Sequence, residues 1–177
     1  GTELCKLYSG VSWNHNITVL DNRFISERVN QLRKWNIDFI HGDILDKDLI
    51  NKHLKNADVV HHLAGVTLVP RTKSEATDEQ NSKIKLVGEQ GTQNVLDAVT
   101  DKCKIIFPST HVVYEGINSV KKNIKEDEPT QPILSYSTSK AKNEKQLKSS
   151  GKNCIILRLG SVYGYSTDSM SCLLYTS

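Results

Sequence analysis

The chain is poor in cysteine. Its four cysteines, Cys5, Cys103, Cys154 and Cys172, are widely spaced along 177 residues and form no CxxC pair. This spacing excludes the disulfide frameworks of small secreted domains and the usual structural zinc sites. We expect reduced thiols, as in a cytoplasmic protein, and no metal site.

Long hydrophobic runs are also absent. No stretch approaches the roughly 18 apolar residues needed to span a bilayer, and the opening GTELCK has neither the basic nor the apolar region of a signal peptide. The net charge is only +3, with both signs interspersed. The sequence therefore predicts a soluble protein of one domain that binds neither nucleic acid nor a membrane.

Short runs rich in Val, Ile and Phe alternate with longer polar segments of helical spacing. This alternation is typical of βαβ units, and several continuous apolar runs favour a parallel sheet covered on both faces. We predict a doubly wound α/β fold. The expected strands are residues 16–20, 37–40, 57–63, 104–107 and 153–157, and the expected helices are 26–35, 47–54, 74–99 and 138–149.

Both ends of the chain depart from this pattern. Residues 1–10 are helical in character with no strand before them, which indicates that position 1 is not a natural N-terminus. Residues 172–177, CLLYTS, follow no pattern set by the preceding chain. We interpret them as a non-native tail resembling a translated sequencing adapter, with an ordinary C-terminal tail as the alternative. The expected domain is residues 1–171.

An acidic residue closes the first expected strand. Asp21 lies about 20 residues after Gly1. At this place in a dinucleotide fold, a carboxylate accepts hydrogen bonds from the adenosine ribose and repels a 2′-phosphate, which favours NAD over NADP. Asp21 and Asn22 equally suit a turn, and the nearby Arg23 leaves NADP open.

Tyr136 and Lys140 have a YxxxK spacing, which places a phenol and an ammonium one helical turn apart on one face. A cation about 6 Å away, at an effective dielectric of 20, lowers a phenol pKa by about two units, to near 8. A cationic oxidised nicotinamide would lower it further, as a general base near neutral pH requires. The alternative is an amphipathic helix with a solvent-facing lysine.

Hydroxyl side chains follow the strand expected at residues 104–107. Ser109 and Thr110 would lie at the carboxyl edge of a parallel sheet, where such sheets bind their ligands. The alternative is that both hydroxyls satisfy turn amides.

Four further segments complete a family resemblance. They are GDI at 42–44, VVHHLAG at 59–65, GTQNVL at 91–96 and LRLGSVYG at 157–164. With the motifs above, residues 1 to about 165 resemble the extended short-chain dehydrogenase/reductase family, the NAD-dependent epimerases and dehydratases of nucleotide sugars. The resemblance implies a Rossmann-like sheet that here lacks its first strand and the C-terminal substrate domain.

The resemblance also implies a cofactor site for NAD. Gly1 resembles the last glycine of the family's GxxGxxG fingerprint, and Asp43 and Ile44 fall where the family holds the adenine. The other expected cofactor residues are Asp21, Asn22, Leu63, Ala64, Gly65, Tyr136 and Lys140.

Thr110, Tyr136 and Lys140 match the family's catalytic Ser/Thr, Tyr and Lys. The resemblance implies that Tyr136 takes the proton from a sugar hydroxyl as hydride leaves the same carbon for NAD. Lys140 would hold the nicotinamide ribose and lower the phenol pKa, and Thr110 would hydrogen-bond the reacting oxygen.

Four positions depart from the family pattern. His111 and Val112 stand where 4,6-dehydratases carry an Asp-Glu pair, so the dehydration mechanism loses its acid and base. Gly88 stands where the family usually has Asn, and Ser161 where a phosphate-contacting Asn is frequent. The last two changes affect the substrate assignment more than the cofactor assignment.

The expected function of the parent protein is that of an NAD-dependent nucleotide-sugar epimerase or oxidoreductase, with a transient ketone. The alternatives are a nucleotide-sugar decarboxylase, a ketone reductase of the same family, and a non-catalytic dinucleotide-binding regulator. By family resemblance, the segments near 74–99 and 138–150 would form a homodimer interface. Because the strands near 16–20 and 37–40 lack a central partner, we expect a gap in mid-sheet and poor folding of the chain alone.

Overall fold

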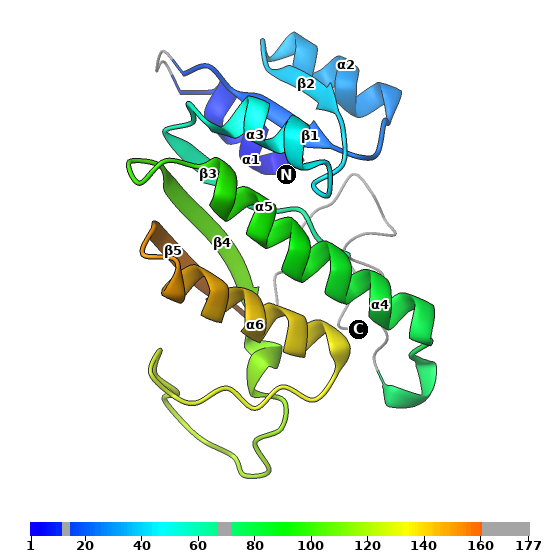
Figure 1. Cartoon of the computed structure of the whole chain (residues 1–177), viewed down its shortest axis with the longest axis vertical. Coiled ribbons are helices and arrows are strands. Elements are labelled where there is room, and N and C mark those ends of the chain that lie inside the picture. The colour runs from blue at the N-terminus through cyan, green and yellow to red at the C-terminus, as the bar shows by residue number, and fades with distance from the viewer. Residues whose placement is uncertain (12–14, 67–71, 161–177) are drawn as a thin grey trace.

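A computed structural model of the chain describes residues 1–11, 15–66 and 72–160 (Figure 1). The expected tail at 172–177 and Ser161 lie outside the described residues. The described strands are β1 (Thr18–Asp21), β2 (Asp38–His41), β3 (Val59–His61), β4 (Lys104–Thr110) and β5 (Asn153–Leu159). The described α-helices are α1 (Thr2–Ser9), α2 (Ser26–Lys34), α3 (Lys47–Leu54), α4 (Asp78–Lys85), α5 (Gly91–Ala98) and α6 (Ser135–Ser149).

The strands are parallel, and they form two sheets. β1 pairs with β2 in one sheet, and the other has the order β3-β4-β5. In the described part of the chain, no ladder joins β1 to β3. The expected division in mid-sheet is therefore confirmed.

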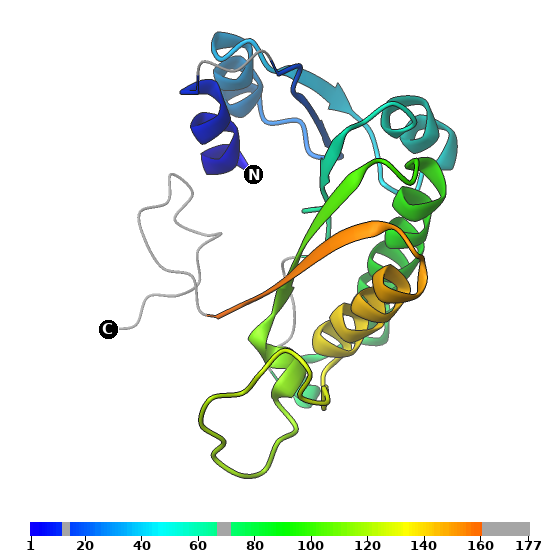
Figure 2. The same cartoon turned by 90° about the vertical axis from the view of Figure 1, so that its left-hand side faces the viewer.

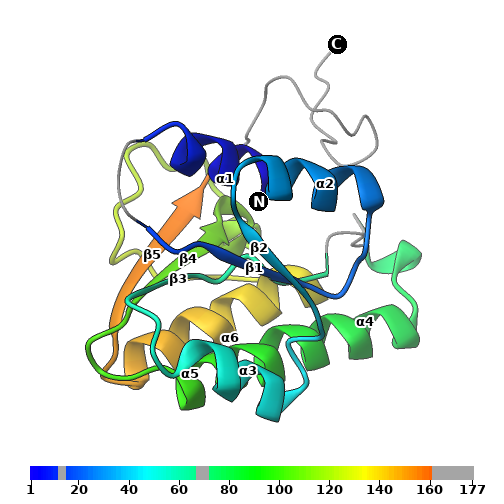
Figure 3. The ribbon, with the colours of Figure 1, turned by 90° about the horizontal axis from the view of Figure 1, so that it is seen from above.

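Helices lie on both sides of the strands, as a doubly wound fold requires. Seen from above, α1 and α2 lie on one side, and α3, α4, α5 and α6 lie on the other (Figure 3). The three-stranded sheet has α5 and α6 against one face, and α4 continues from α5 on the same side (Figures 1 and 2). The predicted fold class, a Rossmann-like α/β sheet, is confirmed.

The main core lies between the three-stranded sheet and α5 and α6. Ile105 and Phe107 of β4 point into it and are almost fully buried, together with Val95 of α5 and Leu147 of α6. Leu20 of β1 also packs against this core, so the two sheets share it. A smaller cluster of Cys5, Leu32 and Ile37 joins α1 and α2 to β1 and β2.

Local sequence signals set several helix boundaries. The Asp46 carboxylate accepts a hydrogen bond from the Leu49 amide and caps α3, and Thr77 forms a capping box with Gln80 at the start of α4. Asn36, with φ of 56°, takes the left-handed conformation that ends α2.

The helix expected at 74–99 is interrupted. α4 and α5 are joined by a π-helical turn at Leu86–Gln90, which contains Gly88. A Cβ at Gly88 would lie 2.2 Å from Ser139 Oγ of α6, and the Gly88 carbonyl accepts a hydrogen bond of 2.9 Å from Asn143 Nδ2. Glycine at this position thus allows the turn to contact α6 directly.

The three-stranded sheet has apolar side chains on its other face. Ile155, Leu157 and Leu159 of β5 are each about 40% exposed, and Val59 of β3 is 49% exposed. On this face Tyr8 of α1 forms a 2.8 Å hydrogen bond with His61 of β3, whereas β5 lies away from α1 and α2 (Figure 2). Contiguous exposed apolar side chains favour association.

The described helices include none long and apolar enough to cross a membrane. Cys5, Cys103 and Cys154 are free thiols. No group of three or more candidate metal ligands occurs in the part of the chain that the structure describes.

Candidate active site

Thr110 ends β4 at the carboxyl edge of the three-stranded sheet. The strand runs through buried Ile105, Phe107 and Ser109 and leaves Thr110 half-buried at the exit. The Thr110 Oγ1 accepts a hydrogen bond of 3.3 Å from the Val112 amide, which starts a 3₁₀ turn at His111–Tyr114. In this structure the hydroxyl satisfies a turn amide, which was the alternative expected from the sequence.

Tyr136 and Lys140 lie on the first turns of α6, which packs against β4. The helix begins at Ser135, three residues before the predicted start. The Lys140 Nζ donates a hydrogen bond of 2.9 Å to the Pro108 carbonyl, two residues before Thr110. The same ammonium lies 4.4 Å from the Phe107 ring centroid and 5.9 Å from that of Tyr136. Lys140 is therefore not a solvent-facing lysine.

Burial affects both titrating groups of this pair. It raises the pKa of the Tyr136 phenol above its ordinary value and lowers the pKa of Lys140 to about 8. The expectation that Lys140 alone brings the phenol towards 8 is wrong for the ligand-free protein. The physical reason is that burial desolvates the phenolate, which raises the pKa of Tyr136, while the Lys140 ammonium donates to the Pro108 carbonyl.

A buried histidine lies beneath Lys140. His62 accepts or donates a 2.9 Å hydrogen bond with Thr92 Oγ1 and contacts the Phe107 ring. Burial, and then the charge of Lys140, lower the pKa of His62 to about 4. The neutral imidazole of His62 thus lies near the Lys140 ammonium.

The residues expected at the adenosine end lie together at the ends of β1 and β2. Asn22 Nδ2 donates a hydrogen bond of 3.1 Å to Asp43 Oδ2, which links the two strand exits. The Asp21 carboxylate accepts the Arg23 amide at 2.9 Å, and the other oxygen of Asp43 accepts the Leu45 amide at 2.9 Å. Asp21 and Asn22 are exposed, so polar groups remain available at this edge.

The remaining expected cofactor residues differ in their exposure. Gly1 precedes α1 and is exposed, as are Leu63, Ala64 and Gly65 after β3. A Cβ at Gly65 would meet no atom within 4 Å, so the chain there is open to a ligand. The Ile44 side chain is buried in the main core, which leaves only its backbone for a contact with adenine.

Sequence reasoning missed an ion pair beneath the site. Arg158 of β5 donates to both carboxylate oxygens of Glu144 on α6, with Nη2 2.6 Å from Oε2. The Glu144 side chain is only 3% exposed and also accepts a 2.6 Å hydrogen bond from the Ser109 hydroxyl. This pair fixes α6 against β4 and β5. Two features of the sequence could have indicated this ion pair. One is a Glu eight residues after Tyr136, and the other is a single Arg in an otherwise apolar strand.

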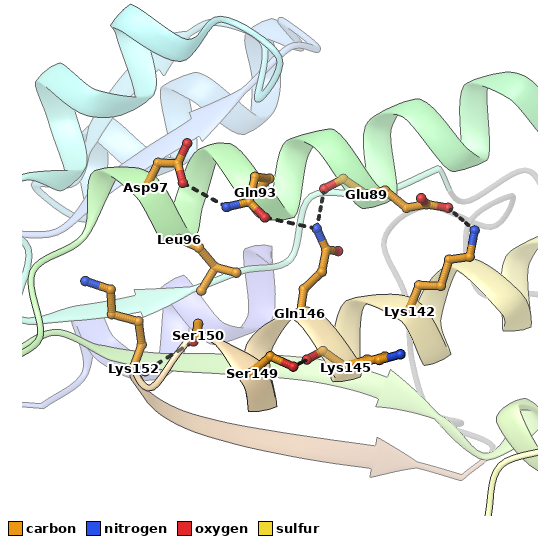
Figure 4. A pocket seen from close by; sticks show the side chains of 10 residues that line it. All are labelled: Glu89, Gln93, Leu96, Asp97, Lys142, Lys145, Gln146, Ser149, Ser150 and Lys152. Atoms are coloured by element: carbon orange, nitrogen blue, oxygen red, sulfur yellow. Dashed lines mark hydrogen bonds and ion pairs between the residues drawn. The ribbon is translucent and has the colours of Figure 1, made fainter.

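One cavity in the described structure lies away from these residues. It is a surface groove of about 760 Å³ between α5 and α6, lined mostly by charged and amide side chains (Figure 4). Gln146 bridges the helices by donating to the Glu89 carbonyl at 3.0 Å, and Lys142 pairs with Glu89 at 3.1 Å. A smaller cavity of about 360 Å³ is lined by Tyr136 and Ser135 of α6 and by Asn81 of α4.

Comparison of the chain with known proteins identifies a family that it matches. The model of the NAD-dependent epimerase/dehydratase family matches residues 1–174. A 3β-hydroxysteroid dehydrogenase/decarboxylase isoform 2 of Arabidopsis thaliana is 32% identical over 143 residues, covering 75% of this chain and 24% of that protein. A UDP-glucose 4-epimerase of Azospirillum brasilense is 31% identical over 138 residues, covering 72% of this chain and 37% of that protein.

Solved structures agree with this fold. The UDP-glucuronic acid 4-epimerase of Bacillus cereus, crystallised with NAD, superposes with a TM-score of 0.74 at 25% identity. That match covers 93% of this chain and 54% of the solved chain. The chain thus spans about half the length of that enzyme, and less than two fifths of the two curated relatives.

Proposed function

The chain belongs to the NAD-dependent epimerase/dehydratase family, and from this premise we propose that the complete protein is an NAD-dependent nucleotide-sugar epimerase or oxidoreductase. The observation that carries the proposal is the placement of Tyr136 and Lys140. Both lie on the first turns of α6, and the Lys140 ammonium is tied to β4 two residues before Thr110.

The described residues fit a dinucleotide. Asp21, Asn22 and Asp43 gather polar groups at the exits of β1 and β2, where an adenosine ribose would accept and donate hydrogen bonds. Gly65 leaves open space at the exit of β3. When bound, NAD supplies the hydride acceptor for oxidation of a hydroxyl-bearing carbon.

Residues of this chain would transfer the proton of the substrate hydroxyl. Tyr136 would take it from the substrate hydroxyl, and Thr110 would hydrogen-bond the reacting oxygen. Lys140 would leave the Pro108 carbonyl to hold the cofactor ribose, while its charge stabilises the phenolate. His111 contacts the Leu159 carbonyl at 3.3 Å, and Val112 carries no acid, so the proposal does not include dehydration.

The test is turnover of a panel of UDP- and dTDP-sugars by the complete protein, followed by NMR of the products. We expect one sugar to give its epimer, and Tyr136→Phe to lower the rate by about 10²- to 10⁴-fold. Unchanged turnover by Tyr136→Phe would reject the catalytic role. A protein that binds NAD but converts no substrate would support the non-catalytic regulator instead.

A second candidate function is oxidation of a secondary alcohol that carries no nucleotide, with or without loss of a carboxyl group. Its support is the Arabidopsis dehydrogenase/decarboxylase, which aligns over 75% of this chain. The two candidates differ in what happens to the reduced cofactor. An epimerase returns the hydride and accumulates no NADH, whereas a dehydrogenase forms one NADH per ketone, which is read at 340 nm.

We also propose that the complete protein is a homodimer through α4, α5 and α6. The outer faces of α5 and α6 form the polar groove of Figure 4, so the contact would be rich in ion pairs rather than apolar. Light scattering tests this. A dimer that Lys145→Glu dissociates would support the interface, and a monomer at micromolar concentration would contradict it.

A further inference from the structure

The loop of residues 115–134 joins the two segments of the proposed active site. It follows the 3₁₀ turn that begins after Thr110, and it ends at α6, which carries Tyr136 as its second residue. Two backbone hydrogen bonds close its base, from the Gly116 amide to the Gln131 carbonyl and from the Gln131 amide to the Val113 carbonyl, both 2.8 Å. The loop therefore leaves and returns at nearly the same point.

The Glu115 carboxylate connects the start of this loop to its end. Glu115 Oε1 accepts hydrogen bonds of 2.6 Å from the amides of both Ile133 and Leu134. The Ser137 hydroxyl also donates to this oxygen. Three donors at the start of α6 thus converge on a single side chain 18 to 22 residues away in sequence.

Glu115 supplies a cap that the helix itself lacks. Leu134 is the residue before α6, and its apolar side chain makes no capping hydrogen bond. Free amides at a helix N-terminus favour a nearby anion, both through hydrogen bonds and through the helix dipole. Burial raises the pKa of Glu115, but the hydrogen bonds from Ser137, Leu134 and Ile133 outweigh it and hold the pKa below its ordinary value. The cap is therefore ionised at neutral pH.

The segment held by this carboxylate forms part of a cavity wall. Ile133, Leu134, Ser135 and Tyr136 line the cavity of about 360 Å³, with Asn81 on the α4 side. A shift of the first turn of α6 would move the Tyr136 ring and this wall together. Placement errors of about 1 Å at a reacting group can cost about 10²-fold in rate.

We propose that Glu115 is a positioning residue that fixes the Tyr136 phenol relative to the Thr110 strand exit. The inference rests on the proposed function, because it assigns Glu115 to the same site. Glu115 acts through the backbone of residues 133–134 and through Ser137, and it does not touch the substrate.

The test compares Glu115→Ala and Glu115→Gln in the complete protein. Glu128→Gln is the matched control, because Glu128 is a glutamate of the same loop that pairs with the exposed Lys121. We expect Glu115→Ala to lower kcat about 10²-fold with KM changed less than about threefold. Glu115→Gln keeps an acceptor oxygen and should lose less, and Glu128→Gln should match the wild type.

A second readout needs no turnover. In protein labelled with 13C at tyrosine Cζ, the Tyr136 resonance is assigned by its loss in Tyr136→Phe. We expect Glu115→Ala to shift or broaden this resonance and Glu128→Gln to leave it unchanged. If the wild type converts no substrate, the proposed function fails, while the resonance still decides the positioning role.

Two results would overturn the inference. One is a Glu115→Ala protein with wild-type kcat, KM and Tyr136 resonance. The other is an equal loss of kcat in Glu115→Ala and in Glu128→Gln, which would indicate a general effect of the loop. Should Glu115→Ala fail to fold, Glu115→Gln and Ser137→Ala replace it, and wild-type values in both would reject the role.

Discussion

At the residue scale, Lys140 combines a proposed catalytic role with a cost in stability. Its ammonium is largely buried, with the Pro108 carbonyl as its hydrogen-bond acceptor, and its pKa falls to about 8. Between pH 8 and about 10.4, the unfolded chain binds more protons than the folded one, so stability rises with pH across this window. Below pH 8 both forms are protonated, and the full penalty for burying the charge remains.

Lys140→Met is therefore expected to stabilise the fold while removing activity. The gain at pH 7 has an upper bound of about 3 kcal/mol, from the lowered pKa and about 1.4 kcal/mol per unit, and it should shrink towards pH 10. Urea unfolding of the complete protein at pH 7 and pH 10 measures this gain. Lys145→Met, at an exposed position of α6, is the control and should show no such pH dependence. A Lys140→Met protein less stable than wild type at both pH values would be evidence against a buried, destabilising charge.

Arg158 should be the most sensitive position outside the catalytic set. Arg158→Met removes the bidentate partner of the buried Glu144 carboxylate and leaves it with the Ser109 hydroxyl and the exposed Lys148, 3.7 Å away; we expect this loss to cost about 3–5 kcal/mol at pH 7. Burial raises the pKa of Glu144, but hydrogen bonds from Arg158 and Ser109 hold it below its ordinary value. The pair's contribution is thus present at neutral pH and lost as the pH falls through that lowered value.

Denaturant titrations of the complete protein, wild type and Arg158→Met, at pH 7 and pH 3.5 test this assignment. The difference should narrow at the lower pH, where Glu144 takes up a proton in the variant. Glu89→Gln, which breaks the more exposed pair with Lys142, should cost less than about 1 kcal/mol. An equal loss of unfolding free energy in Arg158→Met and Glu89→Gln would show that the buried Glu144–Arg158 pair contributes no more than an exposed pair.

At the element scale, contact between the π turn and α6 depends on Gly88. A Cβ at this position would lie 2.2 Å from Ser139 Oγ but 3.5 Å from Ser139 Cβ, so the hydroxyl is the obstacle. Gly88→Ala should destabilise by about 1–3 kcal/mol, and Ser139→Ala in the same chain should recover much of that loss. A double-mutant cycle in the complete protein, followed by thermal unfolding, measures the coupling. Additive effects would contradict the close contact.

The order and type of the helices and strands could be predicted from the sequence, because the spacing of apolar residues is a property of each short segment. The strands begin within two residues of the predicted starts, whereas β4 and β5 run further, to Thr110 and Leu159, because they pair with each other along their full length. The break at 86–90 was not predicted, since it depends on contact with α6, more than 50 residues away.

The site was predicted in part for the same reason. Tyr136 and Lys140 share a helix face by spacing alone, and the structure places them there. The Pro108 carbonyl as partner of Lys140, the Glu115 cap and the Glu144–Arg158 pair join distant segments, so no local pattern could show them. The direction of the Tyr136 pKa was wrong because it depends on burial, which the spacing does not report.

At the scale of the whole molecule, the division into two sheets and the open apolar face predict how the 177-residue chain behaves alone. Ile155, Leu157 and Leu159 are exposed together on β5, and no described ladder joins β1 to β3. We expect the chain to bind a hydrophobic dye, to unfold over a broad temperature range, and to show no saturable NAD binding. A cooperative transition raised by NAD would contradict this.

The account as a whole depends on the phenol of Tyr136 becoming a base when the dinucleotide is present. Its ionisation is measured in the complete protein as the 295 nm difference between wild type and Tyr136→Phe, with and without NAD. Without NAD we predict a Tyr136 pKa raised by burial above that of an ordinary phenol, and with NAD a fall of at least about one unit, which Lys140→Met diminishes. A Tyr136 pKa that NAD leaves unchanged would contradict the account.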